Sequence, residues 1–184
     1  MLELLLFFRL DLVVERITVT GDSAQVVIKN QGLEPVTADT PFWVDLYVNP
    51  HPLPTGVNQT WSSLCGEGMA WGVEGGALPL GPGEELTLVN GDAYYRAEYS
   101  NFSGVFAAGV PIYVQVDSAN ADTSHGAVLE SHEIAGEAYN NIGGPAYVSA
   151  AGRQGDADAD ADADRRRSDG RLGEAGPDRL PARP

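Results

Sequence analysis

The chain of 184 residues carries 26 acidic and 11 basic residues, which gives a formal net charge of −15. So negative a surface repels phosphate, which argues against nucleic-acid binding and is typical of a soluble extracellular protein or of one that works with cations. The single cysteine, Cys65, rules out an internal disulfide framework, and the apolar run within MLELLLFFRL is too short to span a bilayer. That run also lacks the basic start of a signal peptide. We therefore expect no membrane insertion, and an extracellular or cell-surface location without a readable export signal.

The first predicted strand lies within DLVVERITVT, residues 11–20. Alternating apolar residues indicate a strand with one buried face, but here the alternation changes phase between Val14 and Ile17. One extra residue would restore the facing of the second half, so the sequence predicts a β-bulge near Glu15–Arg16.

Four further segments alternate with the same period of two, and each predicts a half-buried strand. In the segment 41–49, for example, Phe42 and Val44 point to one side while Trp43, Asp45 and Tyr47 point to the other. Turns rich in Gly, Pro, Asn and Asp separate the segments, and no long amphipathic helix interrupts them. This pattern predicts an all-β fold: an antiparallel Ig-like β-sandwich of about seven strands over residues 9–148. The four segments are SAQVVIKN (23–30), PFWVDLYVN (41–49), EELTLVN (84–90) and VPIYVQVDS (110–118).

A long inserted loop, residues 50–82, separates two of these strands and contains Trp61 and Trp71. Loops of this length are usually functional or have structure of their own. In one interpretation the two tryptophans close an end of the sandwich, and MAWGVEG (69–75) adds an edge strand. In the other, Trp61 and Trp71 form an aromatic recognition surface for a sugar or a protein, together with Tyr94 and Tyr95.

The tail, residues 149–184, has no apolar periodicity and contains an alternating Ala-Asp run. Such low-complexity, charge-blocked sequence predicts disorder. Read one base later, GC-rich codons for this run encode alternating Pro and Thr, so one hypothesis is that the tail is a frameshifted extracellular linker.

The stretch LESHEIAGEAYNN, residues 129–141, contains a His-Glu pair that suggests a zinc helix. Such a helix needs a second histidine four residues after the first, where this chain has Gly136. The chain also lacks a G-x-S-x-G nucleophile motif, and no pair of carboxylates stands out as a glycosidase pair. With no catalytic motif supported, we predict that it is not an enzyme. The strand pattern favours a last strand and closing turn over 129–141.

Calcium is the one candidate cofactor. Asp117 lies at the end of the strand at 110–118, Asp122 follows it in the next turn, and Glu130 and Glu133 come shortly after. Carboxylate oxygens are the ligands that Ca²⁺ prefers, so these four residues are the predicted metal ligands. The alternative is a solvated turn held by hydrogen bonds of its Asx side chains.

Six motifs, taken in order, make the chain resemble the CARDB family, the cell-adhesion-related domain of bacterial surface and secreted proteins. The resemblance spans residues 10–142, with His132 where the family has Asn and with a longer segment at 50–82. It implies an Ig-like fold, a role in adhesion, display or spacing, and no catalysis. In such a domain Asn140 and Asn141 would tie the chain end to neighbouring backbone through their amides. The motifs are DLVV, VVIKNQG, PFWVDLYVN, LGPGEELTL, IYVQVDSAN and VLESHEIAGEAYNN.

The resulting expectation is a non-catalytic extracellular or cell-surface module for adhesion or structural presentation, within a larger secreted multidomain protein. Its partner would be a protein or a cell-surface glycan, and the module itself would be monomeric. Two alternatives stay open: a carbohydrate- or calcium-binding module, and an accessory domain of a secreted hydrolase.

Overall fold

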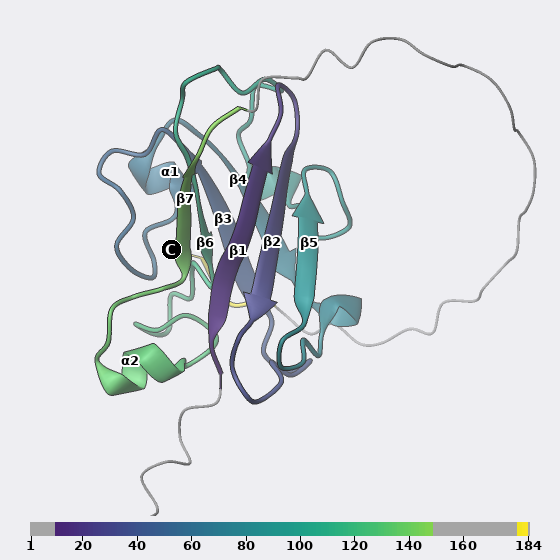
Figure 1. The fold of residues 1–184 in the computed structure, drawn as a ribbon, viewed down its shortest axis with the longest axis vertical. Coiled ribbons are helices and arrows are strands. Elements are labelled where there is room, and N and C mark those ends of the chain that lie inside the picture. Colours follow the sequence, from purple (N-terminus) through teal and green to yellow (C-terminus); the bar gives the residue numbers. More distant parts are fainter. Residues whose placement is uncertain (1–9, 149–179, 184) are drawn as a thin grey trace, which may run out of the picture.

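The computed structural model describes residues 10–148 and 180–183. Within them, seven strands form two antiparallel sheets that pack face to face (Figure 1). One sheet has the order β1-β2-β5 and the other β4-β3-β6-β7, so the predicted all-β sandwich is confirmed. The strands of the first sheet are β1 (Leu12–Val19), β2 (Ala24–Asn30) and β5 (Glu85–Val89). Those of the second are β3 (Phe42–Val48), β4 (Glu67–Val73), β6 (Ile112–Val116) and β7 (Ile142–Ala146).

The predicted bulge in β1 is confirmed. Val14 pairs with Ile28 and Arg16 pairs with Val27, so the register with β2 shifts at Glu15. The shift lets both halves of the strand direct their apolar side chains to the same side.

The inserted segment 50–82 is structured. It forms α1 (Trp61–Leu64), the predicted extra edge strand β4, and the 3-10 turn η1 (Gly75–Ala77). β4 pairs antiparallel with β3 along its whole length, and α1 packs against it at Gly68. A Cβ at that position would lie 2.5 Å from the Trp61 ring, so only glycine allows this approach.

The central strand β3 is buried on both faces, whereas its sequence predicted one core face. On its inner face lie Phe42, Val44 and Leu46, each fully buried between the sheets. Its outer face is buried as well, since α1, the 3-10 turn η2 (Ala97–Tyr99) and the segment 180–183 lie over it. The outer residues Trp43, Asp45 and Tyr47 are at most 3% exposed.

Residues 129–141 do not form the last strand, and that prediction was wrong. They contain a short helix, α2 (Ser131–Ala135), at one end of the sandwich (Figure 1), and the last strand starts only at Ile142. The backbone N–H of Glu130 donates to Glu133 Oε2 at 3.1 Å, an interaction of the capping-box type that favours helix initiation. Gly136 then ends the helix in the left-handed conformation, with φ of 68°.

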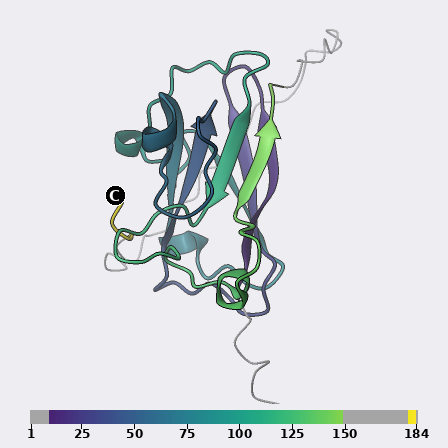
Figure 2. The same ribbon diagram turned by 90° about the vertical axis from the view of Figure 1, so that its left-hand side faces the viewer.

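The predicted disordered tail falls mostly outside the described residues, which exclude 149–179 and 184. Its residues 180–183 are placed, however, and they lie against the four-stranded sheet. Figure 2 shows them in yellow on the opposite side of the molecule from β1 and β2. Among the described helices, none has the length and apolar composition needed to cross a bilayer.

Candidate functional site

The predicted aromatic surface is not assembled as expected. Trp71 is fully buried in the core, and its Nε1 donates to the carbonyl of Val89 at 3.0 Å. Tyr95 packs edge-on against it, with ring centroids 6.0 Å apart, and Tyr94 is half-buried against the same core. Trp71 therefore presents no face to a sugar or a partner, because its indole fills the space between the sheets.

Trp61 belongs to a different part of the molecule. Its side chain covers the outer side of β4, is 8% exposed, and donates from Nε1 to the carbonyl of Tyr99 at 2.8 Å. Of the two tryptophans that were predicted to form one recognition surface, Trp71 therefore lies in the core and Trp61 on the outer face.

The outer face carries an aromatic pair that the sequence did not single out. Trp43 and Tyr99 meet edge to face, with ring centroids 5.1 Å apart. The guanidinium of Arg183 lies 4.5 Å from the centre of the Trp43 ring and 5.8 Å from that of Tyr99. This is cation–π geometry, and Arg favours it because its guanidinium is planar and weakly hydrated.

Asp45 is the charged partner of that guanidinium. Arg183 Nη1 lies 2.7 Å from Asp45 Oδ1, and Nη2 lies 2.8 Å from Oδ2, which makes a two-pronged ion pair. The Asp45 side chain is fully buried and that of Arg183 is only 7% exposed, so solvent screens the pair little. The N–H of Trp61 also donates to Asp45 Oδ2 at 2.9 Å and fixes the carboxylate.

Backbone and apolar contacts hold the rest of the segment 180–183. Trp43 Nε1 donates to the carbonyl of Pro181 at 2.7 Å, and the N–H of Ala121 donates to that of Ala182 at 2.9 Å. Leu180 packs on the cluster formed by Trp43, Ala70 and Ala119. Gly72 leaves room for Leu180, since a Cβ there would overlap with its Cδ1.

A pocket of about 300 Å³ adjoins the guanidinium. Residues at α1 and at η2 line it. The lining residues are Thr60, Trp61, Ser62, Glu98, Tyr99, Ser100 and Arg183. We call this outer face, with Trp43, Asp45 and Tyr99 at its centre, the arginine site.

The four predicted calcium ligands do not form one cluster. Asp117 is buried and uses both oxygens on backbone, accepting from the N–H groups of Ala127 and Val128 at 2.8 Å each. Burial raises the pKa of Asp117 to about 7, while those two hydrogen bonds act to lower it. Asp122 is exposed, and Glu133 accepts from the N–H of Glu130. Asp117 therefore organises the turn at 126–128.

A different cluster contains the fourth predicted ligand, Glu130. Among the described residues, Asp11, Glu130 and His132 form the one set of three metal-ligating side chains whose ligand atoms all lie within 4.8 Å of one another. His132 Nδ1 lies 3.8 Å from Glu130 Oε2 and 3.9 Å from Asp11 Oδ1. The chain order hides this cluster, because Asp11 immediately precedes β1 whereas Glu130 and His132 lie at α2.

Glu130 is fixed between distant parts of the chain. Its Oε2 accepts from the N–H of Leu12 at 2.7 Å, and its Oε1 accepts from Asn141 Nδ2 at 2.5 Å. Burial, with smaller contributions from the charges of Asp117 and Asp11, raises the pKa of Glu130 to about 9, although its hydrogen bonds with Leu12 and Asn141 act to lower it.

The two asparagines that were expected to bind backbone bind carboxylates instead. Asn141 donates to Glu130, and Asn140 Nδ2 donates to Asp11 Oδ1 at 2.9 Å. The backbone at this point already has partners, as when the N–H of Ser131 donates to the carbonyl of Leu10 at 2.9 Å. The amides are therefore free to orient the acidic side chains.

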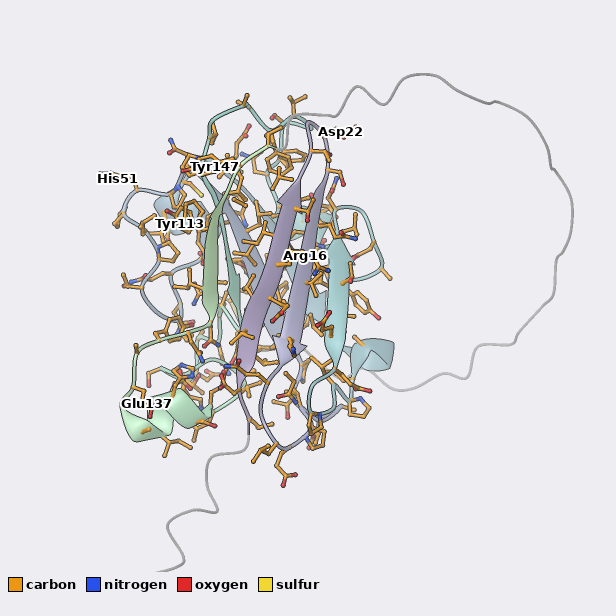
Figure 3. The ribbon with its side chains drawn as sticks, viewed as in Figure 1. Arg16, Asp22, His51, Tyr113, Glu137 and Tyr147 are labelled. Carbon is orange, nitrogen blue, oxygen red and sulfur yellow. The ribbon has the colours of Figure 1, made fainter. Side chains whose placement is uncertain are left out.

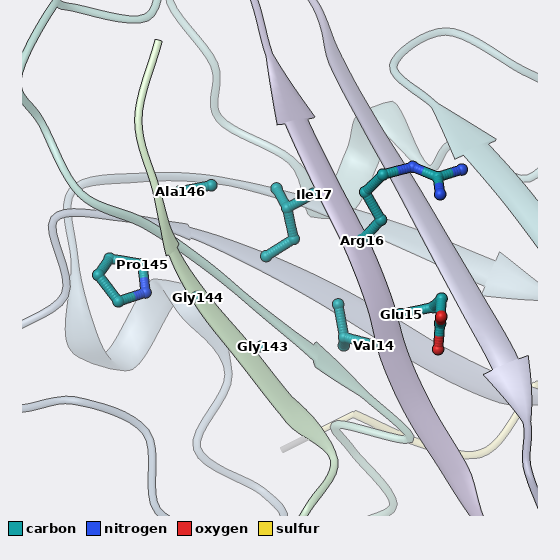
Figure 4. A pocket seen from close by; sticks show the side chains of 8 residues that line it. All are labelled: Val14, Glu15, Arg16, Ile17, Gly143, Gly144, Pro145 and Ala146. Carbon is teal, nitrogen blue, oxygen red and sulfur yellow. The ribbon is translucent and has the colours of Figure 1, made fainter. Parts of the chain in front are cut away.

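A groove of about 230 Å³ separates the edge strands β1 and β7. Figure 4 shows Val14 and Ile17 pointing from β1 toward β7, while Glu15 and Arg16 point away. Gly143 closes the groove at one point, since a Cβ there would lie 2.7 Å from Val14 Cγ1. Apolar side chains, charged residues and backbone of both strands line the groove, and we assign no ligand to it.

No family model matches the chain, and a search of curated proteins finds no match either. The resemblance to CARDB therefore rests on the order of its motifs.

Proposed function

We propose that the protein is a non-catalytic β-sandwich module that recognises an extended, arginine-containing peptide at the arginine site. The observation that carries the proposal is the guanidinium of Arg183, which makes a bidentate ion pair with the buried Asp45 and lies over the ring of Trp43. A planar fork on a carboxylate between aromatic rings is specific for arginine, and lysine cannot reproduce it.

The contacts of the segment 180–183 describe what such a peptide needs. Two of its carbonyls, those of Pro181 and Ala182, accept hydrogen bonds, and these do not depend on side-chain identity. Specificity comes from the packing of Leu180 on its apolar cluster and from the ion pair of Arg183 with Asp45. The net charge of −15 adds long-range attraction for a basic partner.

In this proposal the module serves adhesion or structural presentation on an extracellular or cell-surface protein. The location is supported by the acidic composition and by the resemblance to CARDB. A glycan-binding function has less support, because Trp71 lies in the core and the Nε1 of Trp61 already donates to Tyr99.

Peptide binding tests the proposal. A variant that ends at Arg179 lacks the docked segment and is expected to bind the synthetic peptide LPARP, residues 180–184, with one peptide per chain. Because the peptide covers Trp43, binding should change the tryptophan fluorescence. Replacing arginine in the peptide by lysine should weaken binding at least about tenfold, and LPAAP should not bind detectably.

Two controls separate recognition from general charge attraction. The scrambled peptide PRALP carries the same charge and should not bind at physiological salt. Asp45→Asn keeps an oxygen for the N–H of Trp61 yet removes the charge, so it should abolish binding. Asp22→Asn changes an exposed residue at the β1–β2 turn (Figure 3) and should leave binding unchanged. Equal binding of LPARP and LPAAP, or none of either, would rule out the arginine site.

A further inference from the structure

The geometry points to a site for one divalent transition-metal ion, of the Zn²⁺ type, formed by Asp11, Glu130 and His132 at the α2 end of the sandwich. This site is separate from the arginine site and does not depend on it. It uses one ligand that the sequence suggested for calcium, Glu130, together with two residues that it did not assign to a metal.

The spacing of the ligand atoms fits a small cation. His132 Nδ1 is 3.8 Å from Glu130 Oε2 and 3.9 Å from Asp11 Oδ1. Ligands bound tetrahedrally at Zn–N and Zn–O distances of about 2.0–2.2 Å lie about 3.4 Å apart. The two distances from His132 need to contract by only a few tenths of an ångström, and the oxygens of Asp11 and Glu130, which lie within 4.8 Å of each other, would move together around the ion.

The same distances are too long for direct hydrogen bonds. A charged N–H···O bond spans about 2.7–2.9 Å, so His132 does not donate to either carboxylate. His132 is only 4% exposed, and neither of its buried ring nitrogens has a hydrogen-bond partner. Buried polar atoms normally have partners, so an unpartnered imidazole nitrogen that faces two carboxylates is placed to bind a cation together with them.

Unpartnered atoms gather at this point. Five buried side-chain atoms of the described residues lack a partner, and four of them belong to His132, Asn140 and Asn141. The two asparagines donate hydrogen bonds from Nδ2 to the carboxylates of Asp11 and Glu130. Their unpartnered Oδ1 atoms are neutral oxygens that could act as metal ligands beside those carboxylates. Such amides are what a metal site requires around its ligands, since they fix carboxylate orientation.

The imidazole itself is held in place. Tyr139 packs edge-on against the ring of His132, with centroids 5.5 Å apart. The hydroxyl of Tyr139 accepts from Gln115 Nε2 at 2.7 Å, so it is anchored on β6. A ring fixed in this way loses little freedom on binding a metal, which favours affinity.

The donor set selects zinc over calcium. Ca²⁺ takes six to eight oxygen ligands, whereas one imidazole nitrogen and two carboxylates suit a tetrahedral ion with a fourth position for water or an amide oxygen.

Metal titration of the full chain tests the site. In the presence of excess Mg²⁺, which occupies loose polyanionic sites, we expect one Zn²⁺ per chain by competition with a chromophoric chelator. At a free Zn²⁺ concentration about a hundred times the Kd, Tm should rise by about 5–10 °C. His132→Asn should lower the affinity at least about a hundredfold, and Asp11→Asn should lower it at least about tenfold.

The matched control is the double variant His51→Gln/His125→Gln, which leaves His132 as the single histidine of the chain. His51 lies away from α2, near the other end of the sandwich (Figure 3). This variant should bind Zn²⁺ as the natural chain does, and its one imidazole should show a ¹⁵N shift on binding. That measurement decides the question even if His132→Asn does not fold. Preference for Ca²⁺, loss of binding in the double variant, or an imidazole resonance unmoved by Zn²⁺ would overturn the proposal.

Discussion

Replacing Trp71 by alanine is expected to lower the free energy of unfolding by about 3–5 kcal/mol. The indole is fully buried between the sheets, so its removal leaves a large cavity, and the carbonyl of Val89 loses its donor. Denaturant unfolding monitored by far-UV circular dichroism would show a lower midpoint at an unchanged m value.

Trp71→Phe is the matched control for this substitution. It refills part of the cavity but cannot donate to Val89, so its cost should lie well below that of alanine. If Trp71→Ala left the midpoint unchanged, the indole could not be part of the core, and the interpretation as a recognition residue would regain support.

Gly126→Ala is the second substitution with a large expected effect, about 2–4 kcal/mol of lost stability. Gly126 has φ of +83°, and a Cβ there would overlap with Asp117 Oδ2. The new methyl group would displace the carboxylate that holds the N–H groups of Ala127 and Val128. Differential scanning calorimetry would report the loss as a lower Tm.

Gly109→Ala isolates the steric part of that effect. Gly109 has φ of +78°, but a Cβ added there would meet no atom within 4 Å, so alanine costs only the left-handed backbone strain of about 1–2 kcal/mol. Equal losses at the two glycines would show that the contact with Asp117 contributes nothing.

The strands could be predicted because their signal is local. Alternation with a period of two located β2, β3, β5 and β6, and the change of phase in β1 even located the bulge at Glu15. The edge strand β4 was predicted in one interpretation, because MAWGVEG has the apolar and aromatic residues of a strand.

Residues 129–141 show the limit of the strand pattern. The neighbouring strands favour a strand over this stretch as well. Glu133 three residues after Glu130, followed by Gly136, is the pattern of a short capped helix. Given more weight, that pattern could have indicated α2.

The sites could be predicted only in part, because they join distant segments. Trp43 lies in β3 and Trp71 in β4, and nothing in the sequence shows that Trp43 meets Arg183 whereas Trp71 fills the core. Asp11 and Glu130 both lie in motifs that the sequence singled out, yet their proximity depends on how β1 and α2 meet at one end of the sandwich.

Glu130 has a consequence for how the protein is made. It accepts from Leu12 at the start of β1 and from Asn141 just before β7. During synthesis β1 can pair with β2 early, but the Leu12 N–H gains this partner only after some 120 further residues have been added, on the order of ten seconds at usual elongation rates. Until then this N–H at the start of β1 has no partner from the rest of the fold. We therefore expect the start of β1 to be open to mispairing until α2 has been synthesised.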